Sequence, residues 1–265
     1  MTGIAWEIGI LMGMLDEGLD LATADVIIGT SAGAFAAAFL ADRQLAVGYD
    51  SQFGPSIEEA ISMAPEVRRQ YQTAIIEGAG DRELVGRNLG RLAKESVTVS
   101  QARRSEIVAS RLATREWPEG PLKITAVNAE TGALHMFERG DGVPFLSAIS
   151  ATGAVPGLWP AVEIGGQTWI DGGVTSAANP RLAGSSRRAF VLAPSTNTFE
   201  GDNGFMLEME QLEATTEVVL VVPDEESRDA IGPNVFDAAR RGVAAAEGRR
   251  QGRSASDSVR RLLEH

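Results

Sequence analysis

The chain has 265 residues, of which 44% are hydrophobic, enough for the core of one large domain or two small ones. It has no cysteine, which excludes disulfides, thiolate metal sites and a cysteine nucleophile, and its two histidines are too few for a histidine-rich metal centre. A net charge of −12 argues against nucleic acid as a partner and against electrostatic docking on anionic lipid. Transient contact with a lipid surface through an apolar patch stays open.

The first third of the chain predicts a helix, a strand and a second helix. Apolar residues recur at the helical period over residues 3–19, which indicates an amphipathic helix ending at Gly18. Val26-Ile27-Ile28 is typical of a short buried strand. The Ala-rich run that begins at Ala32 predicts a buried helix, and residues 43–56 are predicted to form a loop.

The middle of the chain is charged and helical at first, and then rich in strands. Residues 56–115 predict helices with breaks at 78–80 and Ser96, and we interpret their charges as a solvated helical face. The elements expected next are strands at 122–128 and 134–137, a short helix at 144–150, and a hairpin of strands at 162–164 and 167–170.

The last third predicts alternating strands and helices. Continuous apolar runs at 190–193 and 218–222 are typical of buried parallel strands. Helices are expected at 204–214 and 234–251, and residues 249–265 are expected to form a polar tail, a loosely held terminal helix. No apolar run is long enough to cross a membrane and no signal peptide is recognisable, so we expect one cytoplasmic α/β domain spanning residues 1–265.

A G-x-S-x-G pattern, Gly29-Thr30-Ser31-Ala32-Gly33, lies between the first predicted strand and the second predicted helix. A nucleophile elbow requires this strand–turn–helix context. The small residues at 29, 32 and 33 would let strand and helix approach closely, leaving Ser31 on a strained turn with its hydroxyl exposed. An ordinary turn between a strand and a helix is the alternative interpretation.

A serine nucleophile needs a base, and the chain offers few candidates. His265 is the last residue of the predicted tail, and His135 lies on a strand with no obvious acid to orient it, so a histidine triad has weak support. Asp171 ends a predicted strand and precedes Gly172-Gly173, which permit a sharp turn and close backbone approach. Partial burial would raise its pKa toward the range that a base needs. A plain Asp-Gly-Gly turn is the alternative.

Together these motifs resemble the patatin-like phospholipase family. The resemblance is carried by GTSAGA at 29–34, by DGG at 171–173, by TGIAWEIGILMGMLDEGL at 2–19, and by the stretch from 124 through AVPG to Asp171; it covers about residues 1–225. It implies a three-layer α/β/α sandwich with a mostly parallel central sheet. It also implies a serine acyl-ester hydrolase of the lipid acyl hydrolase or phospholipase A type, with Ser31 as nucleophile, Asp171 as general base, and neither metal nor organic cofactor.

Family members usually carry a strand and a Gly-rich loop before the segment that here reads TGIAWE, and the N–H groups of that loop form the oxyanion hole. This sequence starts at Met1-Thr2-Gly3, so only Gly3 corresponds to the loop and Ala32 offers a second donor. We expect that the natural chain starts upstream of Met1. Without the missing strand, we expect Val26–Ile28 to lie at an exposed sheet edge or beside a groove.

The resemblance implies an acyl ester or phospholipid as substrate. Trp6, Leu158, Trp159 and Pro160 would line an acyl site or belong to the ordinary core. Two other functions stay open: a serine acyltransferase, for which His135 would be the histidine partner, and a non-catalytic acyl-binding module. Acyl chain, head group and oligomeric state are not encoded in any pattern that we recognise.

Overall fold

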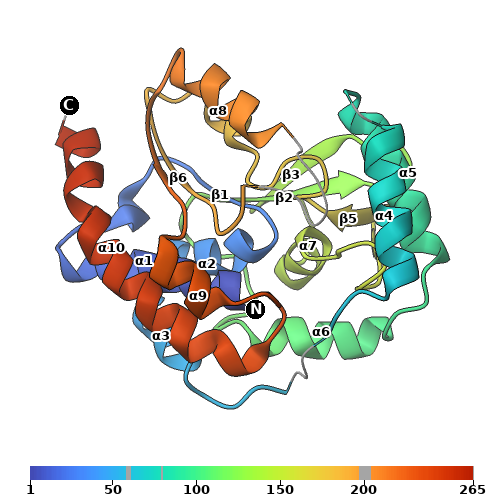
Figure 1. Cartoon of the computed structure of the whole chain (residues 1–265), viewed down its shortest axis with the longest axis horizontal. Helices are drawn as coiled ribbons and strands as arrows, with labels where there is room; N and C mark the ends of the chain where they lie inside the picture. Colours follow the sequence, from blue (N-terminus) through green and yellow to red (C-terminus); the bar gives the residue numbers. More distant parts are fainter. Residues whose placement is uncertain (58–60, 79, 197–203, 265) are drawn as a thin grey trace.

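The computed structural model describes residues 1–57, 61–78, 80–196 and 204–264, whose helices surround two β-sheets (Figure 1). The α-helices are α1 Thr2–Asp16, α2 Ala32–Ala41, α3 Leu45–Ser51, α4 Pro65–Glu77, α5 Arg82–Glu95, α6 Gln101–Ser110, α7 Phe145–Thr152, α8 Phe205–Glu213, α9 Glu225–Ile231 and α10 Arg241–Glu264. The strands are β1 Ile27–Gly29, β2 Leu122–Asn128, β3 Leu134–Glu138, β4 Val162–Ile164, β5 Gln167–Asp171, β6 Arg188–Leu192 and β7 Glu217–Val221. Short 3₁₀ helices cover Leu21–Thr23, Pro180–Ala183 and Ala238–Arg240.

Strand β2 organises the larger sheet because it pairs with β1, β3 and β5. One of its edges is taken by β3, and the other edge is shared by β1 and β5. β1 runs parallel to β2 and ends where Gly29 lies opposite Ile124, whereas β5 runs antiparallel and ends where Asp171 lies opposite Ala126. The carboxyl ends of β1 and β5 therefore point toward each other. Thr125 is the one residue of β2 between the positions opposite those two ends.

The larger sheet is mixed, which corrects the expectation of a mostly parallel sheet. Among the described residues β1 and β2 pair in parallel, whereas β2–β3, β2–β5 and β4–β5 are antiparallel. Short apolar strands have the same composition in either orientation, so their direction cannot be read locally. β1 has no strand partner on its other side within the described part of the chain, and it forms an edge as expected.

Helices cover both faces of this sheet, which gives the expected α/β sandwich. On one face, Ile124 and Trp169 share a buried cluster with Phe35 of α2 and with residues of α7. On the opposite face, Val127 and Ile170 share a second cluster with α4 and α5. Successive residues of a strand point to opposite faces, so neighbouring positions on β2 and β5 contribute to separate cores.

Strands β6 and β7 are parallel, as predicted, but they form a separate two-stranded sheet. Ala189 and Val191 on β6 pack against Phe205 and Met209 of α8. Most residues of β7 are only half-buried, so the prediction of two fully buried strands was wrong. The β6 residues alternate in burial because the strand is packed more tightly on one side than on the other.

The helices of the charged region match their predicted breaks. α4 ends before 78–80, and Ser96 follows the last residue of α5; residues 58–60 and 79 of this region lie outside the described part. The predicted loop at 43–56 instead contains α3. A Cβ at Gly48 of α3 would lie 2.7 Å from the Phe39 ring, so this glycine permits helix packing and does not mark a loop.

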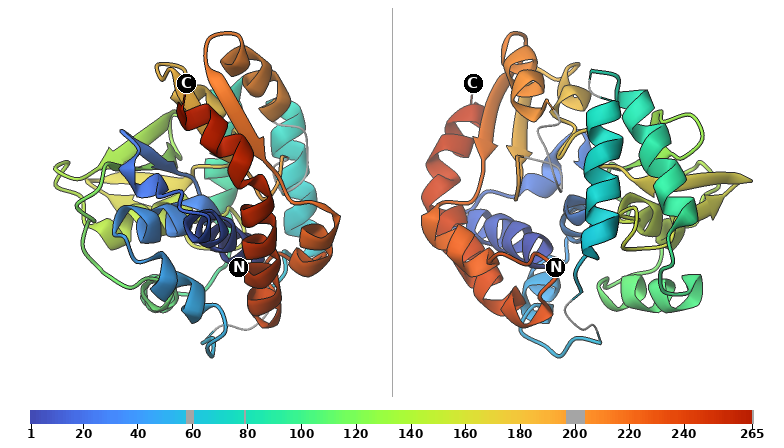
Figure 2. Two further views of the ribbon diagram at one scale, coloured as in Figure 1. Left: turned by 90° about the vertical axis from the view of Figure 1, so that its left-hand side faces the viewer. Right: turned by 45° about the vertical axis from the view of Figure 1, so that its right-hand side comes forward.

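The C-terminal segment is helical through Glu264, as expected, but it is packed against the N-terminal helix, which corrects the expectation that it is loosely held. The helix predicted at 234–251 begins at Arg241 and continues to Glu264 along α1 (Figure 2). The packing was missed because small residues such as Gly252 and Ser256 form much of the contact with α1, and Val259 is a rare large apolar residue among them. The same contact buries α1 on nearly every side. The prediction that this helix is amphipathic was therefore wrong. Across the described residues no helix combines the length and apolar composition that a bilayer crossing needs.

Glycines on both helices set the spacing between α1 and α10. A Cβ at Gly9 would lie 2.2 Å from the Ala245 carbonyl oxygen, and one at Gly252 would lie 2.2 Å from the Ile10 carbonyl oxygen. Asp16 near the end of α1 accepts hydrogen bonds from Arg249, which lower its pKa. The backbones of the two helices are therefore in direct contact, and any larger residue there must push them apart.

We expect Gly252→Ala to destabilise the protein although Ala favours a helix over Gly by about 1 kcal/mol. The added methyl group would overlap the backbone of α1 and cost about 1–3 kcal/mol. The measurement is urea unfolding of both proteins. Ser258→Ala, an exposed position on the same helix, is the control and should change the free energy of unfolding by less than about 0.5 kcal/mol. A stabilised Gly252→Ala protein would contradict the close packing.

Candidate active site

Ser31 lies on a strained turn between β1 and α2, as the elbow prediction required. Its φ of 50° and ψ of −117° are unusual for a residue with a side chain. A Cβ at Gly29 would lie 2.4 Å from Cα of Ala34, so the glycine lets the strand and the helix meet. The N–H of Ser31 donates a 2.8 Å hydrogen bond to Oγ1 of Thr152 on α7, which helps to hold the turn.

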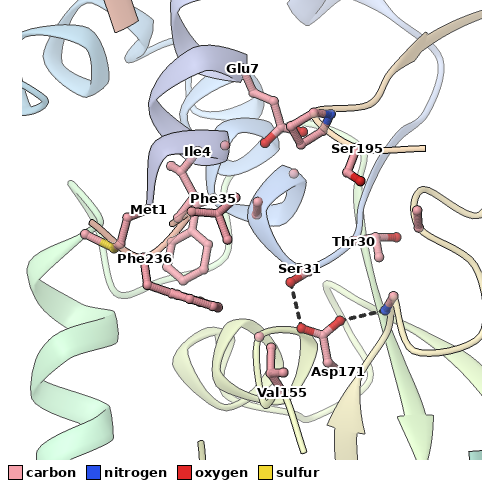
Figure 3. A pocket seen from close by; sticks show the side chains of 18 of the residues that line it. Met1, Ile4, Glu7, Thr30, Ser31, Phe35, Val155, Asp171, Ser195 and Phe236 are labelled. Atoms are coloured by element: carbon pink, nitrogen blue, oxygen red, sulfur yellow. Dashed lines mark hydrogen bonds between the residues drawn. The ribbon is translucent and has the colours of Figure 1, made fainter. Parts of the chain in front are cut away.

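Asp171 lies within hydrogen-bonding distance of Ser31, although the two residues are 140 positions apart. Oγ of Ser31 donates to Oδ2 of Asp171 at 2.6 Å, and Oδ1 accepts from the N–H of Gly173 at 2.6 Å (Figure 3). A Cβ at Gly172 would lie 2.2 Å from Oγ1 of Thr125, so only glycine lets the turn approach β2. Both glycines of the motif therefore have a defined steric or hydrogen-bonding role.

The burial of Asp171 changes its acidity. Asp171 is 4% exposed, and loss of hydration raises its pKa to about 6. The hydrogen bonds from Ser31 and Gly173 and the positive charge of Arg104 oppose this rise, because they stabilise the carboxylate. Arg104 is itself buried, donates to the Gly153 carbonyl at 3.0 Å and lies over the Trp159 ring. Asp171 can thus accept and return a proton near neutral pH.

Two further polar side chains, which the sequence analysis missed, support the two turns through Thr30. Nδ2 of Asn179 donates to Oγ1 of Thr30 at 3.1 Å and to the Gly172 carbonyl at 3.0 Å. Oγ1 of Thr125 also donates to Oγ1 of Thr30, at 2.8 Å. Asn179 is 2% exposed and adopts a left-handed conformation with a φ of 49°. It links the elbow to the Asp-Gly-Gly turn, and the only sequence signal for it was the Asn-Pro dipeptide after that turn.

Ser31 and Asp171 open onto a cavity of about 550 Å³. Much of its wall is apolar, with contributions from Met1, Ile4, Phe35, Val155, Trp159 and Phe236. Of the residues proposed for an acyl site, Trp159 lines this cavity. Trp6 instead belongs to the core between α1 and α10, and Leu158 and Pro160 are not part of the cavity wall. The cavity is large enough for a small-molecule ligand.

Two helices begin at the cavity wall near Ser31. Gly3 is in the first turn of α1 and Ala32 is the first residue of α2, and a Cβ at Gly3 would lie 3.7 Å from Cβ of Ala32. Within the described residues neither N–H has a hydrogen-bond acceptor, as is usual in a first helical turn. The N–H of Gly33 instead donates to the Thr30 carbonyl at 2.9 Å. Gly3 and Ala32 thus offer donors to an anionic oxygen, whereas Gly33 does not.

His135 is not near the hydrogen-bonded pair. His135 is exposed on β3, where its ring contacts Phe137 and Trp169, and it does not line the cavity. His265 lies outside the described residues. Within the described ranges, no group of three or more His, Asp or Glu side chains is arranged to hold a metal ion.

A second buried carboxyl group lines the cavity, and the sequence analysis did not identify it. Glu7 of α1 is 3% exposed, and its Oε2 has no hydrogen-bond partner in the described structure. Burial raises its pKa from an ordinary 4.5 to about 8. The helical pattern of residues 3–19 did not indicate that Glu7 is buried, because an acidic residue in a predicted amphipathic helix normally faces solvent.

The raised pKa of Glu7 makes a prediction for stability. Between pH 4.5 and about 8 the folded protein holds a proton on Glu7 that the unfolded chain has released, so stability falls as the pH rises through this window. We expect Glu7→Gln to gain roughly 1–4 kcal/mol relative to the wild type as the pH is raised across it.

The measurement is urea unfolding at several pH values. Glu77→Gln, which alters an exposed glutamate of α4, is the control and should show no comparable gain. A constant difference between Glu7→Gln and the wild type at all pH values would mean that Glu7 is ionised in the folded protein.

Comparison with protein-family models matches residues 1–183 to a family described as Patatin-like phospholipase. Comparison with curated proteins found no match. The matched segment contains both Ser31 and Asp171 and spans more than half of the chain, and it supports a lipid acyl hydrolase function of the phospholipase type. The chain belongs to the patatin-like phospholipase family.

Proposed function

We propose that this protein hydrolyses carboxylic acyl esters of lipids, with Ser31 as nucleophile and Asp171 as general base. The observation that carries the proposal is the 2.6 Å hydrogen bond from Oγ of Ser31 to Oδ2 of Asp171 at the wall of a largely apolar cavity. A hydroxyl next to a carboxylate is activated because the carboxylate can take its proton during attack. The raised pKa of Asp171 makes it a stronger base than an exposed aspartate.

In the first step, Oγ of Ser31 attacks the ester carbonyl carbon and its proton passes to Oδ2 of Asp171. The carbonyl oxygen becomes an oxyanion, which we assign to the N–H groups of Ala32 and Gly3. Fixed donors at such a position stabilise the transition state, and removing one from a hydrolase costs about 10²–10³ in rate. Gly29 and Gly33 contribute by shaping the elbow, and we assign them no hydrogen bond to the oxyanion.

In the second step, the tetrahedral intermediate collapses and the ester C–O bond breaks. Asp171 returns its proton to the departing alkoxide, which leaves as an alcohol, and the acyl group stays on Ser31. Water then attacks the carbonyl carbon of the acyl-enzyme while Asp171 takes a proton from the water. The bond between Oγ and the acyl carbon breaks as Asp171 returns this proton to Oγ, and the fatty acid leaves. Each proton that Asp171 accepts is returned within the same half-reaction.

We assign the acyl chain to the apolar part of the cavity. Met1, Phe35 and Phe236 gather on one side of Ser31, with Val155 below (Figure 3). Burying a methylene group there contributes about 0.8 kcal/mol, so chain length is recognised through this wall. The apolar wall fits the acyl half of either a phospholipid or a simpler ester.

We also propose that residues 1–265 act as one patatin-like domain. The family match ends at residue 183, yet Leu192, Pro194 and Phe236 line the same cavity as Ser31. Removing the C-terminal third would therefore open one side of the substrate site.

We expect Ser31→Ala to abolish both ester hydrolysis and labelling by an organophosphonate ester probe, because the probe bonds to the activated hydroxyl. Asp171→Asn should abolish hydrolysis, because an amide cannot accept the serine proton. His135→Ala should keep most of the activity, because His135 lies away from the cavity. The measurement is hydrolysis of a short-chain nitrophenyl ester.

Mass spectrometry of the labelled peptide identifies the modified residue. Labelling that persists in Ser31→Ala would exclude Ser31 as nucleophile. A loss in His135→Ala as large as that in Ser31→Ala would favour a histidine-dependent acyltransferase.

We expect kcat/KM to rise with pH with a midpoint at about 6, because Asp171 must be ionised in the free enzyme. Arg104→Met should move this midpoint to higher pH, since the positive charge lowers the pKa of Asp171. Arg115→Met, at an exposed loop position, is the matched control and should leave the midpoint unchanged. A midpoint that stays the same in Arg104→Met would show that Arg104 does not act on the base.

A further inference from the structure

Glu7 is a buried acid at the cavity wall that the hydrolysis steps do not use. It lies on α1, is 3% exposed, and its Oε2 has no hydrogen-bond partner in the part of the chain that the structure describes. Buried polar atoms are nearly always hydrogen-bonded, so one without a partner at the wall of a ligand cavity indicates a contact that a ligand supplies.

The space for this carboxyl group depends on the elbow itself. A Cβ at Gly33 would lie 3.2 Å from Oε1 of Glu7, so glycine at this position of the G-x-S-x-G motif lets the carboxyl reach the start of α2. Ser31 is two residues earlier on the same turn. Glu7 is therefore held close to the reacting group by the geometry of the nucleophile motif.

Burial keeps Glu7 uncharged at neutral pH, since it raises the pKa of Glu7 to about 8. An uncharged carboxylic acid has one O–H donor and can also accept. It suits an uncharged oxygen on a ligand. An anionic group would gain no ion pair there, and an ammonium group would require Glu7 to lose its proton.

Several apolar side chains of the cavity wall lie together beside Ser31, and the charge of Arg111 lies over the ring of one of them, Phe35. In Figure 3, Met1, Phe35 and Phe236 lie to the left of Ser31, whereas Glu7 and Ser195 lie above it. An ester bound at Ser31 has two halves that must extend in different directions. With the acyl chain beside the apolar side chains, its alcohol half extends toward Glu7.

We propose that Glu7 is a specificity-determining residue that hydrogen-bonds an uncharged oxygen in the alcohol half of the ester. Glu7 then favours esters whose alcohol carries a hydroxyl or ether oxygen over esters of plain alkanols. This inference rests on the proposed ester hydrolysis and adds the recognition of the leaving group.

The experiment compares esters that differ only by one oxygen. 2-Methoxyethyl and 3-methoxypropyl butanoate are measured against butyl and pentyl butanoate, which have the same number of non-hydrogen atoms and the same acyl group. The two ethers place the oxygen at different distances from the ester. The readout is the kcat/KM ratio of each ether ester to its alkyl partner in wild type, Glu7→Gln and Glu7→Leu.

Each protein has a distinct expected result. At neutral pH the wild-type ratio for at least one ether should exceed that of Glu7→Leu by about three- to tenfold. This factor corresponds to the free energy of one neutral hydrogen bond. Glu7→Gln should keep most of this preference, because its amide still donates. Raising the pH past about 8 should reduce the wild-type preference, because ionised Glu7 cannot donate, and should leave that of Glu7→Gln unchanged.

The ratio isolates Glu7 from the other charged groups at the site. Those groups are Asp171, Tyr71, Arg68, Arg104, Arg111 and the amino group of Met1, whose charge lowers the pKa of Glu7. Titration of Asp171 affects both esters of a pair alike, so it cancels in the ratio. The amino group of Met1 is present in every variant, so Glu7→Gln reports any effect of its titration.

The failure of this inference differs from the failure of ester hydrolysis. If the wild type cleaves none of the four esters or the nitrophenyl ester, the proposed function fails. If it cleaves them with ratios that are equal in all three proteins, hydrolysis stands and the role of Glu7 is overturned. If Glu7→Leu does not fold, wild type and Glu7→Gln decide through the pH dependence: equal ratios at every pH overturn the inference.

Discussion

The hydrogen bond between Ser31 and Asp171 depends on two strands that meet end to end along one edge of β2. β1 and β5 approach from opposite directions, and their ends are separated by the single register position of Thr125. The turns that follow them therefore face each other at short range. Glycines at 29 and 172 are required because the backbone at each position packs against α2 or β2 without room for a side chain. Thr152 and Asn179 then fix the two turns relative to each other.

Burial determines the chemistry of the cavity. Asp171 and Glu7 are both carboxyl groups with little contact with water, and the pKa of each is raised, to about 6 and about 8. The difference follows from their partners. Asp171 has two hydrogen-bond donors and the charge of Arg104 nearby, whereas Oε2 of Glu7 has no hydrogen-bond partner among the described residues and only the charge of the Met1 amino group lowers the pKa of Glu7. At neutral pH one group is thus suited to act as a base and the other to donate a hydrogen bond.

The cavity also depends on contacts far from it. α1 carries Gly3 and Glu7, and its position is set by direct backbone contact with α10, through Gly9 and Gly252 among others. A helix that contributes to a binding site must be held within a fraction of an ångström, and backbone contact between two long helices provides such rigidity. The C-terminal helix therefore has a structural role in the site although it does not line the cavity.

The sequence alone determined the local features of this protein. A β-branched strand, G-x-S-x-G and an Ala-rich helix predicted a strained turn at Ser31, and Asp171 was predicted as its partner from a strand followed by Asp-Gly-Gly together with the family resemblance. These predictions depend on backbone conformation over a few residues, which composition largely fixes. The tertiary structure alone decided the features that require residues far apart: the antiparallel pairing of β2 with β5, the packing of α10 on α1, and the positions of Asn179 and Glu7. Strand direction and burial depend on long-range contacts, so the same residues read as solvated or as buried until the partner surface is known.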